Sequence, residues 1–128
     1  LGLAHLPSVG DDSIMYRNLE SVCRNYAASG VTRILLARAM EDRAELELCQ
    51  NIISAANTTV CRLVASIAEM QRRVKIRESG TLQQQFVDRV VILDAILDRA
   101  ALEDFVVVNE NRPLSEVAQE MLIKAGWI

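Results

Sequence analysis

The sequence has few of the residues that mark the commonest kinds of functional site. Its 128 residues include one histidine, His5, and three cysteines that never form a CxxC pair. Neither a zinc site nor a Cys–His or Ser–His–Asp set is therefore indicated. No apolar run approaches the roughly 20 residues that span a bilayer. No basic-then-apolar leader opens the chain, so we expect no membrane association.

The chain also has little excess of charge of either sign. A net charge of −3 gives no overall attraction to nucleic acid, so we expect no nucleic-acid partner and only a local basic site. Aromatic residues make up 4%, and aliphatic side chains must fill the core of the single domain predicted for residues 1–128. Cys23, Cys49 and Cys61 are widely spaced in apolar patterns, which predicts reduced core thiols of a cytoplasmic protein.

What the chain does contain is an alternation of helical and β patterns. Short apolar strands are predicted at 32–37, 58–64 and 105–108, and helices at about 12–29, 41–56, 66–80, 81–101 and 115–125. This order, αβαβααβα, predicts right-handed βαβ units and a parallel sheet. Ser66 with Glu69, and Thr81 with Gln84, have the spacing of capping boxes at two helix starts.

The most distinctive stretch runs from Asn57 to Gly80. A short β-branched run feeds a helix in which Arg72, Arg73, Lys75 and Arg77 fall within six residues. A buried strand that leads into a cluster of cations suits a phosphate-bearing ligand at the carboxyl edge of a parallel sheet. The alternative is an ordinary solvated amphipathic helix.

Three segments carry a resemblance to a known family. They are RNLESVCRNYAASGVTRILLA (17–37), CRLVASIAEMQRRVKIRESG (61–80) and ILDAILDRAALEDFVVVNENRPLSEVAQEMLIKAGW (92–127). They resemble P-loop small-molecule kinases of the adenylylsulfate kinase, gluconate kinase and shikimate kinase type, including bacterial ATP-binding proteins of that group. The resemblance implies an α/β fold, a three-layer parallel sheet with helices on both faces. It also implies an ATP- and magnesium-dependent phosphotransferase that acts on a small-molecule acceptor.

The chain departs from that family in one decisive respect. It has no GxxxxGK[ST] loop, its five glycines are isolated, and its only lysines are Lys75 and Lys124. We therefore expect a P-loop NTPase-like domain that lacks its first two strands, as the C-terminal two thirds of a kinase-like protein. Such a chain would not be catalytically competent alone. The strands at 32–37 and 58–64 would flank a missing strand and expose unpaired edges.

The resemblance assigns phosphate-binding lid residues to the helix at 66–80, namely Arg72, Arg73 and Arg77. Guanidinium groups there would neutralise charge on the transferred phosphoryl group. The alternative is that Arg73 pairs with Glu69 and the others are solvated. We assign the carboxylates farther along the chain to solvation, namely Asp88, Asp94, Asp98, Glu103 and Asp104.

Two further groups of residues follow from the resemblance. Arg17 and Asn18 would contact the acceptor substrate, or would be an exposed helical pair. Asn109, Asn111 and Arg112 would bind the nucleotide near its adenine, although turn chemistry alone also explains an asparagine-rich loop.

Two other functions stay open on the sequence. The first is a non-catalytic α/β interaction module that forms a homodimer or binds a partner through an open sheet edge. The second is a flavodoxin-like regulatory domain, which is weaker because the acidic pocket of such domains is missing.

Overall fold

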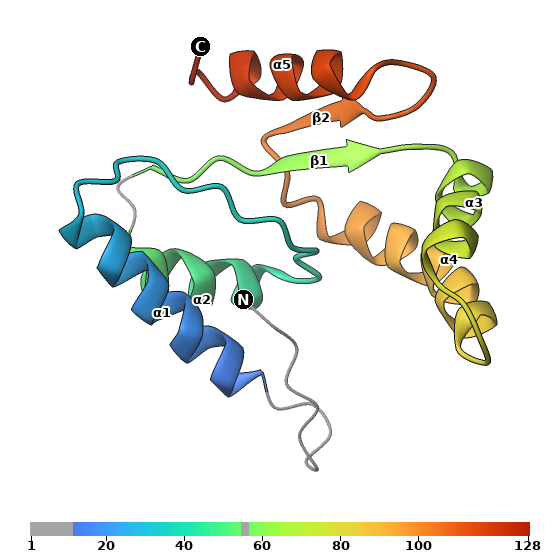
Figure 1. Cartoon of the computed structure of the whole chain (residues 1–128), viewed down its shortest axis with the longest axis horizontal. Helices are drawn as coiled ribbons and strands as arrows, with labels where there is room; N and C mark the ends of the chain where they lie inside the picture. The colour runs from blue at the N-terminus through green and yellow to red at the C-terminus, as the bar shows by residue number, and fades with distance from the viewer. Residues whose placement is uncertain (1–11, 55–56) are drawn as a thin grey trace. The chain divides into compact units, whose positions relative to one another are not determined.

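Figure 1 shows the computed structural model, which describes residues 12–54 and 57–128. The loop predicted at 1–11, with His5, and the predicted helix end at Ala56 lie outside the described residues. The chain divides into two compact units, Leu1–Thr58 and Thr59–Ile128. None of the described helices is long and apolar enough to cross a bilayer. The prediction of one domain over residues 1–128 stays a prediction.

The first unit pairs two amphipathic helices, α1 (Ser13–Ala28) and α2 (Arg43–Ile53). Helix α2 begins at Asp42, whose carboxylate accepts the Glu45 N–H at 2.8 Å, as expected of an N-cap. The buried residues that hold the helices together are Leu19, Cys23 and Cys49. Partly buried apolar side chains complete this small core, namely Tyr16, Ile34, Leu36, Met40, Ile52 and Ile53.

The strand predicted at 32–37 does not form, and this prediction is wrong. Residues 31–41 have no regular secondary structure, although burial still alternates along them. Ile34 and Leu36 pack on the helical core, whereas Leu35 between them is 67% exposed. A strand needs a hydrogen-bonding neighbour, and the sheet in the described part of the chain contains only two other segments.

The second unit contains that sheet, formed by β1 (Cys61–Val64) and β2 (Phe105–Val108). The strands are parallel, with Cys61 opposite Phe105 and Val64 opposite Val108. Between them the chain forms α3 (Ile67–Arg77) and α4 (Gln83–Ala100), which pack on each other, and α5 (Leu114–Lys124) then packs on β2. The predicted strand at 105–108 is confirmed, and the one predicted at 58–64 is shorter than expected.

Strand alternation sends the side chains of this sheet to two faces. On one face Arg62 reaches α4, where it binds Asp94 and Asp98 at 2.8 and 2.6 Å. On the other face Phe105 lies under Lys124 of α5, with the ammonium 5.9 Å from the ring centroid. Val107, on the same face as Phe105, is completely buried.

The expected fold class is wrong. A three-layer parallel sheet of the P-loop NTPase type needs several adjacent strands covered by helices on both faces. Over the described residues the chain instead has five helices and one two-stranded parallel sheet. The described part of the chain is helix-rich, and the helices, rather than a wide sheet, contribute most of its structure.

The start of α4 also differs from the prediction. Thr81 and Gln84 do not form a capping box, because the N-cap position is Leu82 and has no side-chain cap. The side chain of Gln83 instead donates to the carbonyl oxygens of Lys75 and Glu78, each at 2.9 Å. These bonds satisfy acceptors at the end of α3 and fix the short connection between the two helices.

Candidate functional site at the sheet edges

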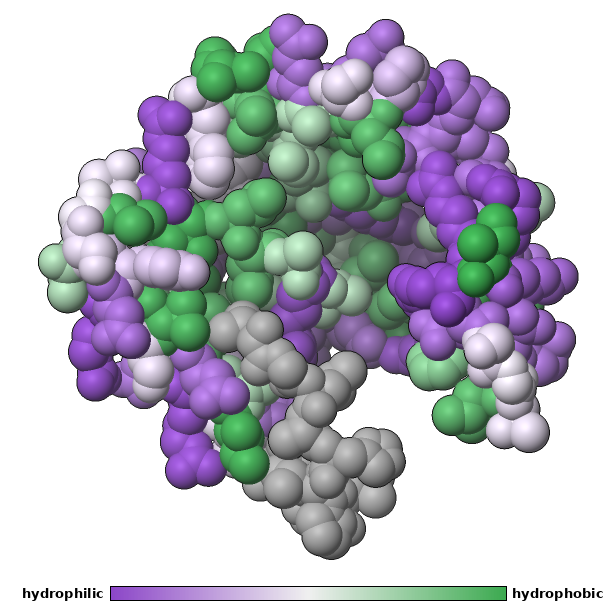
Figure 2. Space-filling view, viewed as in Figure 1, coloured by the Kyte–Doolittle hydropathy of each residue, from purple (hydrophilic) through white to green (hydrophobic). Residues whose placement is uncertain are grey.

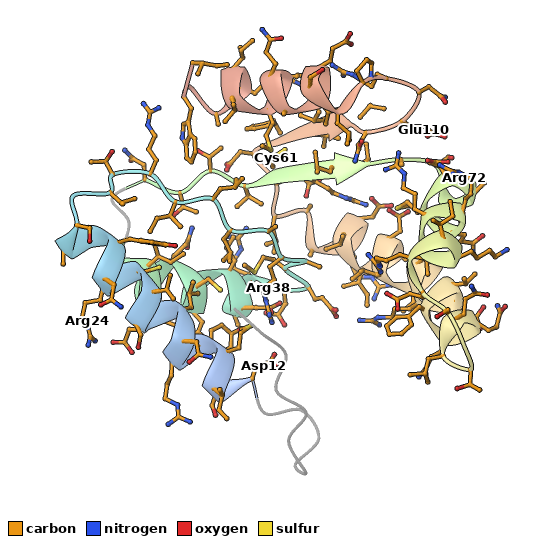
Figure 3. All side chains as sticks on the ribbon, viewed as in Figure 1. Asp12, Arg24, Arg38, Cys61, Arg72 and Glu110 are labelled. Atoms are coloured by element: carbon orange, nitrogen blue, oxygen red, sulfur yellow. The ribbon has the colours of Figure 1, made fainter. Side chains whose placement is uncertain are left out.

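The carboxyl ends of the two strands meet where β1 leads into α3. Ser66 is the N-cap of α3, and its hydroxyl oxygen accepts the Glu69 N–H at 3.2 Å. The reciprocal half of the predicted capping box is missing, because the N–H of Ser66 donates to Glu110 instead, at 2.8 Å. The Ser66 hydroxyl also donates to Glu110, at 2.7 Å. Glu110 and Arg72 lie at this end of the sheet in Figure 3.

Glu110 therefore places a carboxylate at the N-terminus of α3. The N–H and hydroxyl of Ser66 stabilise the charged form and lower the pKa of Glu110. A helix N-terminus favours an anion, and this is where a phosphate would bind. The chain fills that position itself. Sequence reasoning missed this role because Glu110 lies in a turn 44 residues away, with no local pattern to mark it.

The arginines of α3 are likewise paired within the chain. Arg72 and Arg73 each donate from Nε to the Glu69 carboxylate at 2.7 Å, and these bonds lower the pKa of Glu69 to about 2. Arg77 pairs with the neighbouring Glu78 at 2.9 Å. The pair between Arg73 and Glu69 is the alternative raised from the sequence. That alternative left Arg72 and Arg77 solvated, whereas both also pair with carboxylates of the chain.

One pair of candidate residues does converge. Arg73 donates from Nη2 to the backbone oxygen of Asn109 at 2.8 Å, which joins the middle of α3 to the end of β2. Asn111 has a φ of 55°, a left-handed turn conformation that asparagine tolerates. Arg112 instead points to α5 and pairs with Glu120. It borders an open hollow of about 320 Å³ lined by Arg112, Glu116, Gln119, Glu120, Ile123 and Lys124.

The two residues predicted to hold an acceptor lie on α1, in the first unit. Arg17 and Asn18 are both exposed. The backbone oxygen of Arg17 accepts the Ser21 hydroxyl at 3.0 Å, an ordinary contact along the helix. Their role in binding an acceptor stays a prediction.

Four of the carboxylates assigned to solvation have structural partners instead. Arg62, whose side chain is 12% exposed, binds Asp94 and Asp98 and lies 3.9 Å from Glu103. Asp104 accepts the Val60 N–H at 2.7 Å, just before β1. A lone arginine within an apolar strand was the available signal, because a charge there needs a partner. Among the described residues, no group of histidine, cysteine, aspartate and glutamate side chains could hold a metal ion.

The two edges of the sheet differ in a way that the sequence did not reveal. The N–H groups of Asp104 and Asn109 donate to the carbonyl oxygens of Val60 and Val64, both at 2.8 Å. Because carbonyl directions alternate along a strand, the backbone groups of Cys61 and Leu63 point away from β2. Within the second unit no hydrogen bond reaches them, and we call this side the β1 edge.

The opposite side, which we call the β2 edge, is covered in part. By the same alternation the backbone groups of Val106 and Val108 point away from β1. Lys124 of α5 donates from Nζ to the carbonyl oxygen of Val106 at 3.0 Å. A lysine at an edge strand is a recognised protection against further pairing, so the β2 edge is guarded where the β1 edge is not.

Comparison with protein-family models, with curated proteins and with solved structures finds no match for this chain.

Proposed function

We propose that this protein is a non-catalytic interaction module that accepts a β-strand from another polypeptide on its β1 edge. The observation that carries this proposal is the difference between the two edges. Within the second unit the outward groups of Cys61 and Leu63 have no partner, whereas Lys124 occupies an acceptor on the β2 edge. Main-chain hydrogen bonds to an open edge are a recurring mode of peptide recognition.

The side chains of β1 support the same function. The strand contains neither proline nor glycine, and its one charged side chain is Arg62. That charge is turned toward α4 and neutralised by Asp94 and Asp98, so it does not repel an incoming strand. Leu63 is 49% exposed and offers an apolar contact. Figure 2 shows apolar surface in the upper part of the view, over α5 and the strands.

The small size of the sheet explains why binding a further strand would be energetically favourable. A sheet of two strands is marginally stable, and three or more strands with a covered apolar face are the usual minimum. A strand added to the β1 edge would satisfy the outward groups of Cys61 and Leu63 and cover part of Leu63. Val106 and Val108, which are 39% and 50% exposed, indicate that the sheet is incompletely covered elsewhere as well.

The experiment is a titration with a synthetic strand peptide of alternating valine and threonine flanked by lysines, followed by fluorescence anisotropy of a label on the peptide. Leu63→Pro removes an outward N–H without removing a bond to β2. Val106→Pro is the matched control on the β2 edge. We expect Leu63→Pro to weaken binding about fivefold to tenfold, the loss of one hydrogen bond. Equal effects of the two substitutions, or no binding by the native chain, would refute the proposal.

Phosphate binding is the competing function, and the contact between Arg73 and Asn109 favours it. In that case ATP with magnesium would have to displace Glu69 from two arginines and Glu110 from the N-terminus of α3. We expect no heat when ATP with magnesium is titrated into the chain in a calorimeter. Micromolar binding that Arg73→Ala abolishes would show that this site, rather than the β1 edge, carries the function.

We place the module in the cytoplasm. Its three thiols are unpaired, and Cys23 and Cys49 are buried core residues, as expected of a protein that folds in a reducing compartment. Labelling of the expressed chain with a thiol reagent, compartment by compartment, tests this placement.

A further inference from the structure

We infer that the strand received by the β1 edge is β1 of a second copy of this chain, in an antiparallel arrangement centred on Leu63. This inference rests on the proposed function and names its partner. A second copy related by a two-fold axis perpendicular to the sheet must present the same edge, and two identical edges then run antiparallel. The remaining question is which residue lies on the axis.

The directions of the backbone groups limit the possible registers. In an antiparallel pair, residues that exchange hydrogen bonds lie directly opposite each other. Only odd-numbered residues of β1 point outward, because Val60 and Val64 are bonded to the β2 side. An axis through Leu63 places Leu63 opposite Leu63 of the second copy. It also places Cys61 opposite Ala65, the residue that follows β1.

Charge and apolar contacts select the same register. An axis through Arg62 would set two arginines directly opposite each other, which is unfavourable between strands. With the axis through Leu63, each Arg62 lies opposite Val64, an apolar neighbour for the stem of the arginine. The two Leu63 side chains, each 49% exposed in one copy, then cover each other on the face of the sheet opposite to Arg62.

The resulting assembly has two guarded outer edges. The β1 strands lie at the centre of a four-stranded sheet, and each outer strand is β2 with Lys124 on its Val106 carbonyl oxygen. Lys124 disfavours further pairing at each outer strand, so we expect pairing to stop at two copies. A closed dimer, and not a filament, is the expected product.

The test combines molar mass with cross-linking. Light scattering over a range of concentrations should show a monomer–dimer equilibrium, and Leu63→Pro should raise the dissociation constant about 30-fold, since each dimer loses two backbone bonds. A variant with Cys61→Ser and Leu63→Cys should form a disulfide-linked dimer on mild oxidation. The matched control, Cys61→Ser with Val106→Cys, should not.

Three results would overturn the inference, and they separate it from the proposed function. A monomer at all concentrations that still binds the strand peptide refutes the second copy and leaves strand docking intact. A monomer that binds no peptide refutes both. Equal cross-linking through positions 63 and 106 refutes the register and the choice of edge, because the guarded β2 edge would then associate equally well.

Discussion

The contact between Arg62 and α4 allows a quantitative test of how β1 is held. Arg62 donates to Asp94 at 2.8 Å and to Asp98 at 2.6 Å from a side chain that is 12% exposed. We consider Arg62→Met, which keeps the apolar stem of the side chain and removes the guanidinium. The substitution leaves two aspartates near each other without their cation.

The size of the expected loss in stability follows from how exposed the two aspartates are. The bond to Asp94, which is 31% exposed, is charge-assisted and partly buried, worth about 1.5 kcal/mol. Asp98 is 68% exposed, and its bond contributes about 0.5 kcal/mol because solvent screens it. We therefore expect Arg62→Met to lower the free energy of unfolding of the second unit by about 2 kcal/mol.

Arg72→Met is the matched control in the same unit. Arg72 is 60% exposed, and Glu69 keeps Arg73 as a partner when Arg72 is lost. The control should lower the free energy of unfolding much less than Arg62→Met does, because solvent screens this exposed ion pair. Urea unfolding followed by far-ultraviolet circular dichroism measures both values. If Arg62→Met costs no more than Arg72→Met, the contact does not anchor β1 to α4 and our account of the sheet is wrong.

Further predictions concern the carboxylates and the thiols. Glu110→Ala should speed amide exchange in the first turn of α3 and leave α5 unchanged, because only α3 loses its anion. The pKa of Glu69 is about 2 in the folded chain, against 4.5 in the unfolded chain. The stability that Glu69 contributes is therefore complete above pH 4.5 and is lost as the pH falls toward 2. Glu69→Gln should flatten acid unfolding curves over that range. Iodoacetamide should modify the partly exposed Cys61 before Cys23 and Cys49, because these two side chains are buried and the reagent cannot reach them. Burial raises the pKa of all three thiols, so access alone sets the order, and equal rates would contradict the packing.

Local sequence patterns predicted a strand and a helix cap correctly, because both depend on residues close together in the sequence. The β-branched run at Phe105–Val108 is a strand, and Ser66 caps the helix that its spacing predicted. The run at 32–37 is also mostly apolar and is not a strand. An apolar run alone does not make a strand, because a strand also depends on a neighbour far away in the sequence.

The contacts that define the site are also distant in sequence. Glu110 reaches Ser66, Arg62 reaches Asp94, and Lys124 reaches the oxygen of Val106, over separations of 44, 32 and 18 residues. The composition of the sequence shows that each charge is present, but pairing depends on which faces meet after folding. The expectation of a wide sheet failed for the same reason, because it assumed pairing that the structure does not make.

Residue-resolved amide hydrogen exchange on β1 tests the central claim most directly. The account predicts that, in dilute monomer, the amides of Cys61 and Leu63 exchange rapidly while those of Arg62 and Val64, which face β2, are protected. Raising the chain concentration or adding the strand peptide should protect Cys61 and Leu63 as well. Protection of Leu63 in the dilute monomer would mean that the β1 edge is already covered within one chain, and would contradict the account.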